Sequence, residues 1–192
     1  MGITTEQFFE NIYSVIFCPK EFYEREDITK SSRLAILTVV SIALIAKLAF
    51  DIFNRQIQSV FYVFGLGWFL ISRIFIWFLT ALFFEYIAKI FDKGGKLPDI
   101  LFYTAFAPIP YIFFAPLNLV KNTGDFGYFI GVVLEVLLYF WIIYLYALSL
   151  RKTYDITLSR SFMLIFLPFI ASFFALYWLV CFISKIWYIF SV

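Results

Sequence analysis

Two residues of opposite charge stand inside otherwise apolar stretches, and they are the first candidates for chemistry. Arg73 lies near the middle of the apolar run 60–84, and Glu135 lies in the run 126–150. A charge at the centre of a membrane-spanning helix costs about 3 kcal/mol, so such a residue is expected to have a partner. The depths of the two residues differ by about 6 Å at 1.5 Å per residue, a gap that an arginine side chain can bridge. The sequence therefore predicts an Arg73–Glu135 pair.

The predicted pair has two interpretations. In the functional one, Glu135 titrates as part of an ion or proton site. In the structural one, Arg73 and Glu135 form an intramembrane salt bridge that selects which helices pack together. The second is favoured, because a permanently charged arginine holds its partner in the ionised form.

The helix that carries Glu135 also carries a pair of glycines. Gly127, Gly131 and Glu135 recur at four-residue steps, which places them on one side of a helix. Two glycines four residues apart let another backbone approach closely, so this face is predicted to contact protein rather than lipid. The pattern predicts helix packing, with dimerisation as one form that it can take. The polar turn 121–125 predicts that the helices on either side of it form an antiparallel hairpin.

The third apolar run, 100–120, contains a predicted helix break. Pro108 and Pro110 stand within it, and each proline removes a backbone donor and clashes with the preceding turn. Carbonyl groups freed at that depth need protein or water as partners. Two alternatives stay open: a broken helix that builds a transporter site, and a plain packing kink.

The side chains of common catalytic and metal sites are missing from this composition. The chain contains no histidine, which excludes haem ligation by histidine, histidine metal ligands and a histidine general base. No pair of intramembrane aspartates suits a protease of that type. We therefore expect a protein that is not an enzyme, with no cofactor and no metal site.

The composition assigns the chain to a membrane. Of its 192 residues, 64% are apolar and 15% are charged, and the mean hydropathy is +0.92. A soluble domain is about 45–50% apolar and about 25% charged. This excludes a water-soluble enzyme, and no nucleic-acid partner is expected. The predicted fold is an all-α, polytopic membrane helix bundle that has the lipid bilayer as its main partner.

Five apolar runs are each long enough to cross a hydrocarbon core of about 30 Å. The predicted organisation is a charged N-terminal segment, 1–33, followed by a transmembrane domain, 34–192. Within the first segment, the amphipathic stretch Thr4 to Phe17 is too short to span and is expected to lie in the headgroup plane. The predicted spans are 34–53, 60–84, 100–120, 126–150 and 162–183.

The basic residues outside the spans predict the orientation. The N-terminal segment carries four of them, and the second and fourth loops carry three each, whereas the opposite side carries three in all. Lysine and arginine are enriched in cytoplasmic loops. The N-terminus is therefore expected in the cytoplasm, and after five spans the C-terminus is expected outside.

Three short motifs carry a family resemblance. They are Val15 to Tyr23 before the first span, the Gly94-Gly95 turn that leads into Phe102 to Pro108, and Trp141 to Leu150 followed by a basic loop and Ser159-Arg160-Ser161. Over nearly the whole length, the chain resembles the Yip family, the Ypt/Rab-interacting proteins and their bacterial relatives. The resemblance implies a non-enzymatic integral membrane protein, linked in eukaryotes to Rab GTPases and early secretory membranes.

The chain departs from the eukaryotic pattern of that family. Its N-terminal segment has only 33 residues, and the Asp-Leu-Tyr-Gly-Pro motif is missing. These differences argue against binding of a Rab-type GTPase and favour a short bacterial-type member. The expected location is the bacterial inner membrane, with a eukaryotic Golgi or ER membrane as the alternative.

Two functions stay open at this point. The first is a membrane scaffold or partner-binding protein, in membrane organisation or trafficking, that binds another membrane protein or a second copy of itself. The second is a small transporter or channel with an intramembrane site formed by Arg73 and Glu135 beside the break at Pro108 and Pro110.

Overall fold

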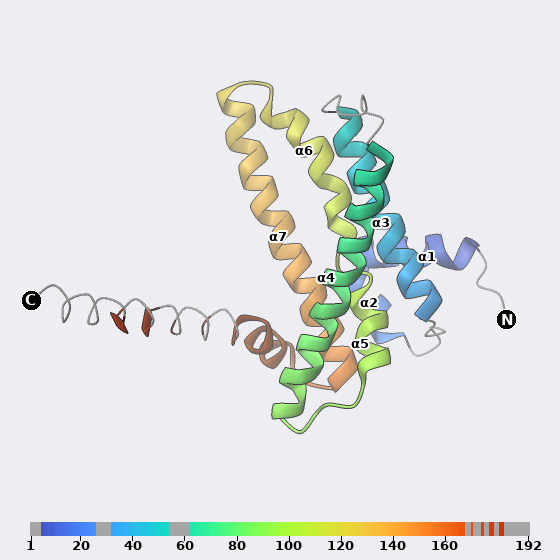
Figure 1. The fold of residues 1–192 in the computed structure, drawn as a ribbon, viewed down its shortest axis with the longest axis vertical. Helices are drawn as coiled ribbons and strands as arrows, with labels where there is room; N and C mark the ends of the chain where they lie inside the picture. Colours follow the sequence, from blue (N-terminus) through green and yellow to red (C-terminus); the bar gives the residue numbers. More distant parts are fainter. Residues whose placement is uncertain are drawn as a thin grey trace, which may run out of the picture.

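The computed structural model describes residues 5–25, 32–53 and 62–167, together with scattered positions between 170 and 182. The described residues form helices and turns, with no strand among them. In chain order, the helices are α1 (Thr5–Phe17), α2 (Pro19–Glu24), α3 (Ser32–Phe53), α4 (Tyr62–Ile90), α5 (Leu97–Thr104), the 3-10 helix η1 (Ile109–Phe113), α6 (Phe114–Lys121) and α7 (Asp125–Tyr154). Figure 1 shows α3, α4, α6 and α7 running along the long direction of the molecule.

Four segments are long and apolar enough to cross a membrane. They are Arg33–Ile52, Tyr62–Ile90, Leu97–Lys121 and Asp125–Tyr154. A further apolar helix, Leu158–Leu167, is shorter. The predicted fifth span, 162–183, begins in this helix, and most of its remainder lies outside the described residues. These helices confirm the predicted all-α, polytopic membrane bundle.

The second and fourth spans are longer than predicted. They continue beyond the expected ends at 84 and 150, as far as Ile90 and Tyr154. With 29 residues in α4 and 30 in α7, each helix measures about 45 Å at 1.5 Å per residue, against about 30 Å of hydrocarbon. Their last turns therefore extend past the hydrocarbon core, at the end where α4 connects to α5 (Figure 1).

One hydrophobic core joins the N-terminal helices to the spans. Phe22 of α2 is fully buried, and its ring centroid lies 4.9 Å from that of Phe106. Leu145 of α7 belongs to the same cluster. In Figure 1, α1 lies across the long direction of the bundle. The two predicted segments, 1–33 and 34–192, thus share this hydrophobic cluster.

A short turn folds α6 back onto α7, as the polar sequence 121–125 predicted. The turn occupies residues 122–124, and Gly124 has a φ of 109°. L-residues with a side chain rarely adopt this conformation, so glycine suits the position. The two helices consequently form an antiparallel hairpin, drawn at the top of Figure 1.

Candidate functional site

The helix break predicted at Pro108 and Pro110 is present. The α-helical pattern stops at Thr104 and resumes at Phe114, with the 3-10 helix η1 between them. Short-range hydrogen bonds hold the backbone in this interval, such as the one from the Tyr111 amide to the Pro108 carbonyl at 2.9 Å. Part of the backbone in the break therefore has its hydrogen bonds satisfied locally. The side chains that follow point in directions different from those of a continuous α-helix.

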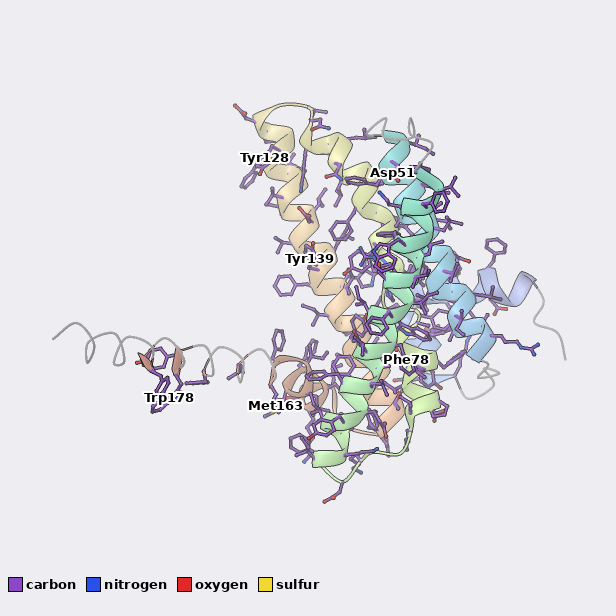
Figure 2. All side chains as sticks on the ribbon, in the orientation of Figure 1. Asp51, Phe78, Tyr128, Tyr139, Met163 and Trp178 are labelled. Atoms are coloured by element: carbon purple, nitrogen blue, oxygen red, sulfur yellow. The ribbon has the colours of Figure 1, made fainter. Side chains whose placement is uncertain are left out.

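A cavity of about 430 Å³ opens beside this break. Small-molecule sites in proteins usually measure about 300–1,000 Å³, so the cavity is large enough for a ligand. Its walls are mainly apolar, and its polar lining consists of Lys47 from α3, Arg73 from α4, Tyr111 from the break, and Tyr139 and Tyr146 from α7. Figure 2 places Tyr139 about halfway along α7, at the depth expected for the middle of a span.

Arg73 is an exposed residue that lines this cavity and has aromatic neighbours. Its guanidinium carbon lies 4.9 Å from the ring centroid of Phe69 and 5.6 Å from that of Tyr111. The attraction of a cation to a ring face is worth about 0.5–2 kcal/mol, depending on how far the pair is removed from water. Among the described residues, no carboxylate lies within ion-pair distance of Arg73.

The structure does not form the predicted Arg73–Glu135 pair. Glu135 instead forms an ion pair with Lys121, the last residue of α6. The prediction compared depths along two helix axes, but the rotation of α7 about its own axis decides which neighbour Glu135 faces. The tight α6–α7 turn brings Lys121 to that face, and Glu135 does not line the cavity that holds Arg73.

The glycine face packs within the chain, against α6. A Cβ atom added at Gly127 would lie 2.5 Å from the carbonyl oxygen of Val120, and one added at Gly131 would collide with the Lys121 side chain. Gly131 therefore leaves the space through which Lys121 reaches Glu135. The predicted helix packing at Gly127 and Gly131 is present, and the helix that packs on this face is α6 of the same hairpin.

A second charged group lies close to Arg73. Asp51 is fully buried, and it accepts hydrogen bonds from the Lys47 ammonium and the Tyr62 hydroxyl, each at 2.7 Å. Lys47 also lies 5.7 Å from the Phe69 ring, the ring that Arg73 contacts. Among the described residues, Asp51 thus neutralises Lys47, and Arg73 is left as the unbalanced charge of the cavity lining. In the described part of the chain, no cluster of three or more acidic or cysteine side chains could hold a metal ion.

Glu85 is a structural residue that sequence reasoning missed. It is 5% exposed, and it accepts hydrogen bonds from the Tyr154 hydroxyl at 2.7 Å, the Lys96 amide at 3.3 Å and the Gly95 amide. An acidic residue near the end of a span is usually taken as an interfacial group. The available signal was the Gly94-Gly95 turn ten residues later, because its exposed amides need an acceptor.

The N-terminal motif is fixed to α5 and α7 through Tyr23. Its hydroxyl donates to the Tyr103 carbonyl oxygen at 3.3 Å and accepts from the Ser149 hydroxyl at 3.2 Å. Burial raises the pKa of the Tyr23 hydroxyl, so it remains a neutral donor. Nearby, Glu24 forms an ion pair with Arg151 at 3.5 Å. The motif Val15 to Tyr23 therefore anchors α2 in the bundle.

Comparison with known families matches the chain to one of them. The family model of the Yip1 domain matches residues 13–179, from the middle of α1 to beyond the helix Leu158–Leu167. Neither the comparison with curated proteins nor that with solved structures gave a match. The family match confirms the resemblance carried by the three motifs and agrees with the membrane-spanning helices. The chain therefore belongs to the Yip family and is a multi-pass membrane protein.

Proposed function

We propose that this protein is a non-enzymatic scaffold that binds a partner protein at the membrane surface, in membrane organisation or trafficking. The observation that carries the proposal is an aromatic stripe on the anchored N-terminal helices. Phe9, Tyr13 and Phe17 are 65%, 62% and 65% exposed, and their four-residue spacing places them on one face of α1.

The setting of the stripe supports a binding role. On the opposite side of α1, Val15 is fully buried and Asn11 and Ser14 are also buried against the protein, so the aromatic stripe faces outward. α2 holds α1 in place through the buried Phe22 and Tyr23. Exposed aromatic patches on a fixed element are typical of binding surfaces. The stripe is thus available to lipid headgroups and to a membrane-protein partner or a second copy of the chain.

The proposed location is the bacterial inner membrane, with the N-terminus in the cytoplasm and the C-terminus outside; a eukaryotic Golgi or ER membrane is the alternative. Contacts among the described residues support the orientation, because the end of α2 and both strongly basic loops meet at one end of the bundle. Arg151 contacts Glu24, and the Lys96 amide contacts Glu85 at that end. No Rab-type GTPase is expected as a partner.

The scaffold role predicts a partner that contacts the stripe directly. A photo-crosslinking residue at Tyr13 is expected to capture a single protein in cells, and the same residue at the exposed Trp68 of α4 is expected to capture none. Replacing Phe9, Tyr13 and Phe17 together with serine should reduce the recovered complex by about tenfold or more, because exposed aromatic residues dominate binding energy.

The control for this experiment keeps the number of aromatic residues removed comparable. Phe64→Ser with Trp68→Ser changes two exposed side chains of α4, 80% and 75% exposed, and should leave the complex intact. Recovery of the wild-type protein in mild detergent only as an unpartnered monomer, with no crosslink at Tyr13, would contradict the scaffold role.

The cavity beside Pro108 favours a second candidate function, a small transporter or channel. Because Arg73 lines the cavity and Glu135 does not, this function predicts that anion flux into proteoliposomes is lost in Arg73→Gln and retained in Glu135→Gln. Absence of flux in the wild-type protein would exclude transport and leave the scaffold role in place.

A further inference from the structure

The cavity beside the helix break carries a positive charge that the described part of the chain does not balance. Lys47 and Arg73 are its two charged lining residues. Asp51 neutralises Lys47 at 2.7 Å, and the second oxygen of Asp51 accepts the Tyr62 hydroxyl. Arg73 contacts two aromatic rings, and none of the described carboxylates lies within ion-pair distance of it. One net positive charge therefore remains in the cavity.

This charge lies deep in the membrane. Arg73 is eleven residues from the start of α4 at Tyr62, which corresponds to about 17 Å, close to half of a hydrocarbon core of about 30 Å. A guanidinium carries five donors in a planar fork, and aromatic rings do not replace the oxygen acceptors that such donors need. An arginine at this depth is stable with an anion or water beside it.

The remaining lining specifies what kind of anion fits. Most of the wall is apolar, and the hydroxyls of Tyr111 and Tyr139 add hydrogen-bond donors to the lining; the Tyr111 ring also contacts Arg73. Lys47, six residues before the end of α3, lines the same cavity about 9 Å from that helix end. The cavity thus extends from mid-depth toward one membrane surface. Such a volume takes one acidic group and the first part of an acyl chain, with the rest of the chain along the exposed apolar surface of α4.

We propose that this cavity binds the anionic head of a membrane amphiphile, a phosphate or carboxylate carried on an acyl chain, with Arg73 as its principal ligand. The proposal goes beyond the scaffold role and does not depend on it. A phospholipid and a fatty acid share this chemistry, and the experiment separates them.

The test measures lipid retention by the full-length protein. Delipidated protein is offered phosphatidylglycerol, phosphatidylcholine, oleate or inorganic phosphate, and bound species are counted by native mass spectrometry. Phosphatidylglycerol or oleate is expected to bind at least about tenfold more tightly than phosphatidylcholine, because the choline cation of that lipid offsets the charge of its phosphate and repels the Arg73 guanidinium. Binding of phosphatidylglycerol identifies the ligand as a phospholipid, and binding of oleate identifies it as a fatty acid.

Two variants locate the binding in the cavity. Arg73→Met keeps a chain of similar length without the charge and should weaken binding about tenfold or more. Arg33→Gln removes an exposed cation at the other end of α3 and should leave the affinity unchanged. Ala43→Phe keeps both cations but fills the cavity that Ala43 lines, and it should also abolish binding.

Several outcomes would overturn the proposal. Equal binding of phosphatidylcholine and the anionic amphiphiles shows that charge is not recognised. Unchanged binding in both Arg73→Met and Ala43→Phe shows that the amphiphile lies elsewhere. Binding of inorganic phosphate without binding of either amphiphile shows that the site takes a soluble anion. Because Arg73→Met removes a charge from the membrane interior, the variant is expected to fold, and its thermal transition verifies this.

Discussion

Replacing Gly127 with leucine is expected to lower the free energy of unfolding by about 3 kcal/mol, the upper end of the range for overpacking. A side chain at this position meets the Thr123 hydroxyl and, at 2.5 Å, the carbonyl oxygen of Val120. The second contact is with backbone, so α6 itself must move away from α7. The measurement is thermal unfolding in a mild detergent, followed by the loss of the monomer peak in size-exclusion chromatography.

Gly67 provides the matched control for Gly127. It also lies inside a membrane-spanning helix, but a Cβ atom added there meets nothing within 4 Å. Gly67→Leu is therefore expected to be neutral or to stabilise α4 by about 0.5–1 kcal/mol, the difference in helix propensity between the two residues. Equal stability of the Gly127 and Gly67 variants would show that the hairpin does not depend on close approach of α6.

The second large effect is expected at Glu85. Glu85→Ala removes the acceptor of three hydrogen bonds, from Tyr154, Lys96 and Gly95. Tyr154 is 1% exposed, so water does not readily replace the lost carboxylate as the partner of its hydroxyl. We expect a loss of about 2–3 kcal/mol, because a buried donor without a partner costs about 1–3 kcal/mol. Chemical unfolding in mixed micelles, without guanidinium as the denaturant, measures this change in the free energy of unfolding.

A surface carboxylate provides the comparison for Glu85. The Glu10 side chain is 61% exposed and pairs with Arg25 at 3.2 Å, and such pairs contribute about 0–1 kcal/mol. Glu10→Ala should therefore be nearly silent. Tyr154→Phe completes a double-mutant cycle with Glu85→Ala, and the two changes together should cost less than the sum of their separate effects. Strict additivity would mean that the Glu85–Tyr154 contact does not stabilise the fold.

Predictions that depend on short stretches of sequence agree with the structure. Four of the five predicted spans coincide with helical segments long enough to cross a membrane, because length and apolar composition are local properties. The break at Pro108 and Pro110 is equally local, since proline removes its own backbone donor wherever it stands. The close-packing role of Gly127 and Gly131 also follows from spacing along one helix.

Predictions that depend on how helices turn toward each other agree less well. Glu135 was paired by depth with Arg73, but α7 turns that carboxylate toward Lys121. An acidic residue near the end of a span, such as Glu85, is usually interfacial, but Glu85 closes a loop ten residues away and contacts Tyr154, 69 residues away. Neither contact can be predicted from periodicity, because periodicity shows which residues share a helix face but not which segment packs against that face.

By itself, the sequence determined that this chain is an all-α membrane protein of the Yip family. It also determined four segments that are long and apolar enough to cross a membrane, and the place where one of them breaks. Burial of apolar residues and the backbone chemistry of proline and glycine act locally, so they can be read along the chain. The tertiary structure alone decided that α2 enters the core through Tyr23 and Ser149, which are 126 residues apart. It also decided that Arg73 faces an apolar cavity rather than a carboxylate. Both results depend on helix rotation and hairpin closure, which are set by packing among distant segments.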